Sequence, residues 1–359
     1  MPSAREHLER LAARPRPAGS AAEAEARAWC AGQLAAHGFS VSESPFEYSA
    51  VPGRVATPVL GVAGTLVLWA AAYLGWHHRP ATALVVLVAA SLGTAALVRW
   101  LARWGVQRLP WRRAVSVNLV ATRHVAQPGL WFVAHLDSKS QPVPIQTRAA
   151  GIVLLIAFVV VAMVIALVQW VGVLPVDVRL WSWLADLCVI PGFAVAASVV
   201  GATSPGAVDN ASGVASLLRL VELAPVGAGF GVLITSAEEL GLAGARAWVA
   251  GRAPADVVNV DSIDDDGRVR VMYTGRRPHA LVATVTRALG GARAGRLLPG
   301  VLVDGIAFAD AGWTAVTVSR ATRDTLARIH TPRDALRELS GAGVELVAGR
   351  LAAMLGAED

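Results

Sequence analysis

The chain has 359 residues, enough for one large domain or two domains of ordinary size. Hydrophobic residues make up 55% of the sequence, charged residues only 16%, and the formal net charge is +6. Soluble domains average about 45–50% apolar and about 25% charged residues, so this composition excludes disorder and argues against a purely soluble protein. It indicates a membrane protein that carries a soluble part.

The N-terminal residues contain no apolar run, so we expect no secretory signal peptide. Ser20 and Glu23 have the spacing of a capping box, which predicts a helix that begins after Ser20 and ends near Ala36. The two cysteines, Cys30 and Cys188, form no Cys-x-x-Cys motif and no disulfide framework. Free cysteines are compatible with a cytoplasmic location.

Four stretches with little or no charge follow in two pairs, each pair joined by a short loop. In chain order the stretches are 57–76, 81–98, 149–171 and 187–200, the last extended backward through 181–186. Because a helix of about 20 residues crosses a bilayer core, we expect two transmembrane hairpins, at 57–98 and 149–200. The alternative is buried helices of a soluble protein, which uncharged runs of about 18 or more residues argue against.

The distribution of basic residues predicts the orientation of these spans. The hairpin loops 77–80 and 173–180 hold one arginine each, Arg79 and Arg179, whereas the segment between the hairpins is rich in arginine. By the positive-inside rule, the polar domain and both termini lie in the cytoplasm. The stretch 99–113 mixes three tryptophans with five arginines directly after a predicted span. That position indicates contact with anionic lipid headgroups, so the expected partner is the lipid bilayer and not a nucleic acid.

The polar remainder alternates short β-rich runs with helical patterns. Strands are predicted over 39–48, 116–121, 130–134, 230–235, 257–260, 269–273 and 315–319, and helices over 213–223, 243–250, 278–289 and 341–355. This alternation predicts an α/β domain with a mixed sheet flanked by helices.

Acids and histidines gather after the predicted strands. They lie in five motifs: HLDS (135–138), VDNASG (208–213), SAEELGLAG (236–244), NVDS (259–262) and IHTPRD (329–334). Any one of these residues is more often a helix cap or an ordinary loop residue than a metal ligand. Together they can meet at one edge of the sheet, and imidazole with carboxylate is a ligand set for zinc and similar metals. The charges of Asp209, Glu239 and Asp261, with a hydroxide, balance two divalent ions.

The order of these motifs resembles the co-catalytic di-zinc aminopeptidase family, which includes bacterial leucyl aminopeptidases and aminopeptidase Y. The stretch 14–39, RPRPAGSAAEAEARAWCAGQLAAHGF, is similar to the N-terminal helix of that family. The resemblance implies a zinc-exopeptidase-like fold with two inserted hairpins. It divides the chain into 1–56 (start of the peptidase domain), 57–98 (first hairpin), 99–148 (interfacial segment and first metal ligand), 149–200 (second hairpin) and 201–359 (remainder of the peptidase domain).

The resemblance also implies roles for individual residues around two zinc ions per chain, with another divalent metal as the alternative. The implied ligands are Asp209, which bridges both metals, His135 and Asp261 at one metal, and Glu239 and His330 at the other. Glu238 is the implied general base, and Asp137 orients the histidine side of the site. A non-proline cis peptide is expected at Asp209–Asn210.

Three features depart from the pattern of that family or stay open. Val208 stands where the family usually has an acid, and Gly305, in Val303-Asp304-Gly305, stands where it has a histidine. The acidic run 264–266 is either a solvated turn or a site that recognises the amine of a substrate.

The sequence therefore predicts an integral membrane zinc metallopeptidase with four spans and a cytoplasmic catalytic domain. The expected activity is that of an aminopeptidase, which hydrolyses the peptide bond with a water between the metals and Glu238 as base. Two alternatives stay open. One is an amidohydrolase that acts on lipid-linked or N-acyl amino acids, and the other is a non-catalytic, metal-binding membrane scaffold.

Overall fold

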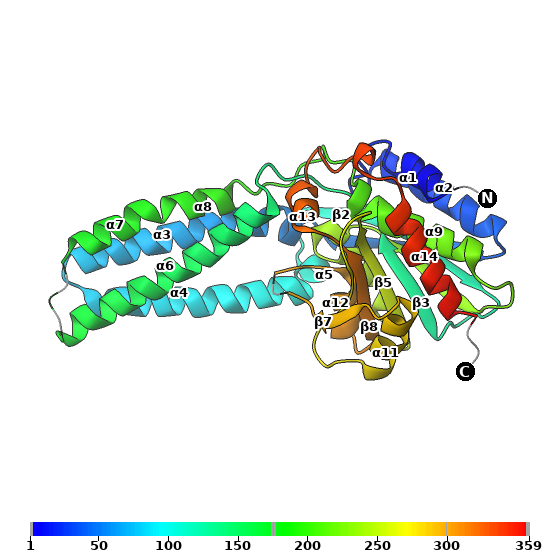
Figure 1. Cartoon of the computed structure of the whole chain (residues 1–359). Coiled ribbons are helices and arrows are strands. Elements are labelled where there is room, and N and C mark those ends of the chain that lie inside the picture. Colours follow the sequence, from blue (N-terminus) through cyan, green and yellow to red (C-terminus); the bar gives the residue numbers. More distant parts are fainter. Residues whose placement is uncertain (1–2, 174, 176, 299, 357–359) are drawn as a thin grey trace. The chain divides into compact units, whose positions relative to one another are not determined.

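The computed structural model describes residues 3–173, 175, 177–298 and 300–356 (Figure 1). The chain divides into two compact units, which we call the sheet unit and the helical unit. The sheet unit contains Met1–Tyr48, Arg112–Ser140 and Gly201–Asp359, and the helical unit contains Ser49–Trp111 and Gln141–Val200. Residues 99–111 and 141–148 belong to the helical unit because its helices extend beyond the apolar runs of the sequence.

Within the described residues, the sheet has eight strands in the order β1-β2-β4-β3-β5-β8-β6-β7. The strands are β1 (Ser40–Ser49), β2 (Arg113–Arg123), β3 (Leu130–His135), β4 (Phe230–Thr235), β5 (Asp256–Ile263), β6 (Val269–Tyr273), β7 (Arg293–Arg296) and β8 (Thr314–Arg320). The central strands β4, β3, β5 and β8 are parallel, whereas β2 and β6 pair antiparallel with β4 and β8. This arrangement confirms the predicted mixed sheet.

The central strands are buried on both faces. The run FGVLIT of β4 is buried at every position, as is typical of parallel strands covered on two sides. Strand β7 is the strand that the sequence analysis does not predict. Its sequence, RAGR, has no β-branched or aromatic residue, and it pairs only with β6 at the edge of the sheet.

Helices cover both faces of this sheet (Figure 1). In the sheet unit they are α1 (Ala4–Leu11), α2 (Ala21–Ala36), α9 (Gly213–Leu223), α10 (Ala243–Val249), α11 (His279–Ala288), α12 (Asp304–Asp310), α13 (Arg323–Arg328) and α14 (Ala342–Met354), with short turns η3 (Ala207–Ser212), η4 (Glu238–Leu240) and η5 (Leu336–Glu338). One group consists of α9, α14, α1 and α2, and another of α10 and α12. Helices α9 and α12 each contact both β3 and β5.

The predicted capping box at the start of α2 forms only in half. The Ser20 hydroxyl accepts from the main-chain N–H of Glu23 at 3.2 Å, as expected. The Glu23 carboxylate, however, accepts from the N–H of Gly19 at 2.7 Å instead of that of Ser20. Glu23 is buried and its other oxygen accepts from the hydroxyl of Ser236. The carboxylate therefore connects α2 to the end of β4, where the SAEELGLAG motif begins.

The helical unit consists of apolar helices, of which α3, α4 and α6 are the longest. They are α3 (Thr57–Trp76), preceded by η1 (Pro52–Ala56), α4 (Pro80–Trp100), continued by η2 (Leu101–Gly105) and α5 (Val106–Arg108), then α6 (Ile145–Val171), α7 (Arg179–Leu187) and α8 (Val189–Ala196). Among the residues that the structure describes, four helical segments are long and apolar enough to cross a membrane: Pro52–Trp76, Pro80–Arg108, Ile145–Val171 and Arg179–Ala196. Large apolar side chains such as Leu92 and Phe193 are exposed on them. Of the predicted loop 173–180, residues 174 and 176 lie outside the described residues.

Small residues let the helices of this unit approach closely. The buried Trp181 of α7 packs on Gly75 of α3, where an added Cβ would lie 2.1 Å from the indole ring. The indole Nε1 donates to the side chain of Gln169 in α6 at 3.0 Å, and Gln169 donates to the carbonyl of Gly75 at 3.3 Å. A glycine is therefore required at position 75 by the packing of three helices.

We expect Gly75→Ala to lower the thermal stability of the full chain in neutral detergent. Overpacking typically costs about 1–3 kcal/mol, more than the roughly 1 kcal/mol that alanine contributes in a helix. Gly93→Ala in α4 is the matched control, because a Cβ there meets no atom within 4 Å. Unfolding midpoints followed by circular dichroism test this difference, and an equal midpoint for both variants would contradict the packing described here.

Candidate metal centre

The carboxyl ends of three neighbouring parallel strands bring the predicted ligands together. His135 is the last residue of β3 and pairs in register with Thr235, the last residue of β4. Glu238 and Glu239 follow β4 in η4, and Asp261 lies near the end of β5. The two remaining ligands come from outside the strands: Asp209 from η3 and His330 from the loop after α13.

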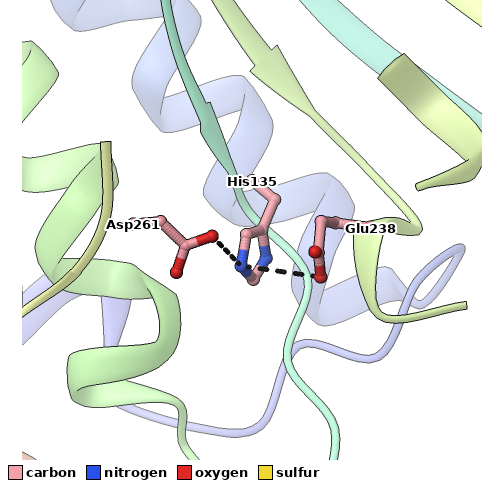
Figure 2. A group of neighbouring side chains, drawn as sticks. All are labelled: His135, Glu238 and Asp261. Carbon is pink, nitrogen blue, oxygen red and sulfur yellow. Dashed lines mark ion pairs between the residues drawn. The ribbon is translucent and has the colours of Figure 1, made fainter. Parts of the chain in front are cut away.

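These six side chains form two adjacent groups. His135, Glu238 and Asp261 make up one group, and Asp209, Glu239 and His330 make up the other. Within each group, one potential ligand atom from every residue lies within 4.8 Å of the others, and all six residues are buried. Figure 2 shows the first group, with the imidazole of His135 between the two carboxylates.

Asp209 lies between the two histidines. Its Oδ1 atom is 3.2 Å from Nε2 of His135, and its Oδ2 atom is 2.9 Å from Nε2 of His330. The second imidazole is also 3.1 Å from Oε1 of Glu239. One oxygen of a single carboxylate thus faces each group, which is the arrangement that a carboxylate shared by two cations requires.

The donor atoms of the centre fit metal ions. Nε2 of His330 and Oε1 of Glu239 are buried, and their short contacts of 2.9 and 3.1 Å do not have the geometry of hydrogen bonds. Nδ1 of His135 lies 3.0 Å from the carbonyl of Asp137, so a proton on Nδ1 satisfies that carbonyl and leaves Nε2 as a lone-pair donor. Imidazole nitrogen and carboxylate oxygen are ligands that zinc accepts.

Asp137 holds the main chain of the two glutamates. Its Oδ1 atom accepts from the N–H of Glu238 at 3.1 Å, and its Oδ2 atom accepts from the N–H of Glu239 at 3.2 Å. The histidine is contacted chiefly by the main-chain oxygen of Asp137, since its carboxylate lies 3.6 Å from Nδ1. Residue 237, directly before the glutamates, is an alanine in the left-handed region with φ 55°. This sharp turn sends the two adjacent carboxylates to different groups.

Asp334 is a residue that the sequence analysis leaves without a role. Its fully buried carboxylate accepts from the N–H of Val208 at 2.7 Å and from the N–H of Asp209 at 3.1 Å. Val208 has no carboxylate to offer, but its main chain is held by one. The position of Asp334 four residues after His330, within the same motif, is the signal that could have found it. The peptide bond Asp209–Asn210 is cis, as expected.

Lys139 is a second residue without a predicted role. Its ammonium lies 2.5 Å from Oε2 of Glu239, and its side chain is only 16% exposed. The sequence could have drawn attention to this residue by composition, because Lys139 is the only lysine among the 32 basic residues (lysine and arginine) of the chain. A compact ammonium beside a ligand carboxylate neutralises part of the negative charge of the centre.

Asp304 is buried beside the first group. Its Oδ2 atom accepts from the hydroxyl of Thr235 at 2.5 Å, whereas Oδ1 has no partner among the described residues. Burial raises the pKa of this carboxyl to about 6. The neighbouring Gly305 has no room for a side chain, because an added Cβ would lie 2.6 Å from Oγ1 of Thr317. A side chain at position 305 would therefore require Thr317 to move.

The acidic run 264–266 is a solvated turn only in part, because Asp266 is exposed whereas Asp264 is buried. The carboxylate of Asp264 is buried, accepts from the hydroxyl of Thr325 at 2.5 Å and pairs with Arg328 at 2.7 Å. Asp265 accepts from the N–H of Gly343 at 2.8 Å. The carboxylates of Asp264 and Asp265 thus hold the start of α13 and the start of α14, so these two are not free to bind the amine of a substrate.

Burial and neighbouring charges shift the pKa values of the carboxyl groups in the centre, upward for Glu238 and Asp261 and downward for Asp209. Burial raises the pKa of Glu238 well above its ordinary value, and the negative charges of Glu239 and Asp304 raise it further against the attraction of His135. Burial raises the pKa of Asp261 to about 7. Burial also opposes ionisation of Asp209, but its close contacts with the two histidines outweigh this effect and hold its pKa below the ordinary value. A buried site with this excess of carboxylates favours cations.

Comparisons with known proteins agree with this geometry. Residues 194–355, a little under half of the chain, match peptidase family M28. No curated protein matches the chain. The match to the family includes four of the five motifs and confirms the expected resemblance to metallopeptidases of the zinc aminopeptidase type.

Solved structures of the same fold have low sequence identity to this chain. An aminopeptidase from Aneurinibacillus sp. strain AM-1 is 15% identical with a TM-score of 0.54, and the alignment covers 98% of this chain and 92% of that chain. A leucine aminopeptidase precursor from Bacteroides thetaiotaomicron is 12% identical, with a TM-score of 0.56 and coverages of 99% and 97%. A glutaminyl cyclase from Fimbriiglobus ruber is 15% identical, with a TM-score of 0.55 and coverages of 99% and 94%. At these identities the likeness establishes the fold alone.

We expect Asp334→Asn to weaken metal binding by about 10- to 100-fold, the range found when a residue that supports a metal ligand is replaced. The amide offers one acceptor where the carboxylate now accepts from two main-chain N–H groups, so Asp209 loses its support. Competition between the protein and a chromogenic chelator measures the affinity for zinc. The control is Asp266→Asn, since Asp266 is exposed in the same unit. Equal affinities in the two variants would exclude this role for Asp334.

Proposed function

We propose that the chain is a membrane-anchored, two-zinc aminopeptidase that hydrolyses peptide bonds. The observation that carries the proposal is the Asp209 carboxylate, whose two oxygens lie 3.2 and 2.9 Å from Nε2 of His135 and of His330. In this proposal His135 and Asp261 hold one metal, and Glu239 and His330 hold the other. The same ligands are compatible with other divalent metals.

When bound, the metals would lower the pKa of a water and polarise a carbonyl group. The remaining tasks belong to side chains. Asp137 fixes the main chain of Glu238 and Glu239, and Asp334 fixes that of Asp209. Both supports are buried, so the ligand geometry is set before a substrate arrives.

Glu238 is the proposed general base. Its carboxylate is buried and lies 3.8 Å from Nε2 of His135, inside the centre. It takes a proton from the attacking water and gives it to the leaving amine. Burial raises its pKa above the ordinary value of a glutamate. Glu239, the adjacent residue, faces the other group and acts as a ligand.

The proposed location rests on the helical unit. Four of its helical segments are long and apolar enough to cross a membrane, and they expose large apolar side chains. Water-soluble proteins rarely expose an apolar surface of this extent. With the excess of arginine in the segment between the hairpins, the positive-inside rule favours a cytoplasmic catalytic domain and cytoplasmic termini.

A second candidate is an amidohydrolase that acts on lipid-linked or N-acyl amino acids. The observations in its favour are the apolar helices and the departures at Val208 and Gly305 from the pattern of the aminopeptidases. Because proteins described as glutaminyl cyclases share the fold, cyclisation of N-terminal glutamine belongs in the same assay. A panel of aminoacyl arylamides, N-acyl amino acids and glutaminyl peptides separates the three reactions by product.

We expect about two zinc ions per chain in protein purified without chelators, measured by mass spectrometry of the metal content. Asp209→Asn should lose at least one of them, because each oxygen of this carboxylate faces a different histidine. One metal in the unchanged protein would keep a hydrolase but contradict the bridging role. No metal, together with no hydrolysis on the panel, would favour the non-catalytic scaffold.

We expect Glu238→Gln to lower kcat at least about 100-fold, the usual size of a lost general-base contribution, while two metals stay bound. The amide has nearly the same shape but cannot accept the proton of the attacking water. Glu47→Gln, at an exposed glutamate of β1, is the control and should leave the rate unchanged. Full activity of the Glu238 variant would show that another group is the base.

A further inference from the structure

The stretch from residue 267 to residue 303 is strongly basic. It contains seven arginines and neither aspartate nor glutamate. The stretch forms β6, α11 and β7 at one edge of the sheet, where Arg270 and Arg293 pair in register on adjacent parallel strands. Like charges opposite each other destabilise a sheet. The metal centre uses none of these arginines.

A cavity of about 320 Å³ lies between this stretch and α14. Four arginines line it: Arg268 before β6, Arg293 at the start of β7, Arg320 at the end of β8 and Arg350 in α14. Pockets for small molecules have volumes of about 300–1,000 Å³, so the cavity is large enough for a small ligand or a lipid headgroup.

The positive charges of the cavity are not compensated. Arg320 donates Nε–H to the carbonyl of Gly267 at 3.1 Å, and Arg350 donates to the carbonyl of Leu289 at 2.6 Å. A carbonyl accepts the hydrogen bond but neutralises no charge. Arg268 and Arg293 are exposed, and the ion pairs that arginine makes within the described part of the chain involve other arginines.

A glycine lets one of these guanidinium groups approach the backbone. An added Cβ on Gly290 would lie 2.7 Å from Nη1 of Arg350, and the φ of this glycine is +71°, a conformation that other residues rarely adopt. The bonds to the carbonyls of Leu289 and Gly267 hold the guanidinium groups of Arg350 and Arg320 in place. Two arginines are thus fixed at the cavity, and the two exposed arginines can close on a ligand.

We propose that this cavity binds a phosphate group, carried by a soluble phosphate compound or by a phospholipid headgroup. Guanidinium groups bind phosphate through paired, charge-assisted hydrogen bonds, and four of them match an anion of two or more charges. Four guanidinium groups gathered around one cavity favour a single compact anionic group over an extended polyanion such as nucleic acid.

The test uses two charge-matched variants of the full chain in an uncharged detergent. The first, Arg268→Gln with Arg293→Gln, removes two exposed arginines of the cavity. The control, Arg276→Gln with Arg277→Gln, removes two exposed arginines of the same stretch that do not line it. Isothermal titration calorimetry with pyrophosphate and with dihexanoyl phosphatidic acid measures binding. The cavity variant should bind at least about tenfold more weakly than the control, since each lost charge-assisted bond weakens binding by about that much.

The comparison of the two probes identifies the source of the phosphate. Tighter binding of pyrophosphate supports a soluble ligand, and tighter binding of dihexanoyl phosphatidic acid supports a lipid headgroup. Because phosphate also binds metal ions, the titrations are repeated on chelator-treated protein, where the difference between the variants should persist. No binding by the unchanged protein, or equal loss in both variants, overturns the proposal. Binding of a single-stranded oligonucleotide that weakens equally in both variants would assign a diffuse basic surface instead, which also overturns it.

Discussion

The burial of like charges at one edge of a sheet is the constraint on which the rest of the centre depends. Asp209, Glu238, Glu239 and Asp261 are each at most 7% exposed, and every one of them loses hydration on folding. Such a loss costs several kcal/mol for each unpaired charge, so each carboxylate needs a proton, a donor or a cation. Positive charge comes from other side chains: imidazoles lie beside Asp209 and an ammonium lies beside Glu239. The carboxylates of Asp137 and Asp334 instead accept from the main-chain N–H groups around these residues. The negative charge that these groups leave uncompensated favours the binding of divalent cations.

The connectivity of the sheet unit shows how the chain holds a long insertion between two candidate ligands in the sequence. Residues 141–200 separate His135 from Asp209 in the chain and belong to the helical unit. The chain leaves the sheet unit at Ser140 and returns at Gly201, and the two residues form an antiparallel bridge with main-chain bonds of 3.0 and 2.7 Å. The two ends of the inserted segment 141–200 are therefore held next to each other by this bridge. An insertion closed in this way adds a large apolar unit without altering the registers of β3, β4 and β5.

Most of the sheet and the order of the candidate metal ligands could be predicted from the sequence. Buried parallel strands have continuous apolar sequences, and the polar residues of the site come directly after them in the chain. The run FGVLIT and the glutamates after it are an example. What could not be predicted depends on tertiary contacts. The short edge strand RAGR has no strand signal of its own, and the buried carboxylate of Glu23 bonds across to Ser236 instead of completing a local cap. Asp264 resembles a surface acid in sequence and is buried against Thr325 and Arg328. Asp334 contacts a main chain more than a hundred residues away.

The use of lysine at one position has a practical consequence. Lys139 is the only lysine in the chain, and its ammonium lies against a carboxylate of the centre. A reagent that modifies lysine amines therefore has a single side-chain target, and that target borders the atom Oε2 of Glu239. Whether Glu239 is engaged by the ammonium or by another cation alters how readily that amine reacts. The extent of modification at this residue, read from one peptide, thus reports the state of a buried centre in the intact protein, with no substrate and no knowledge of what the enzyme cleaves.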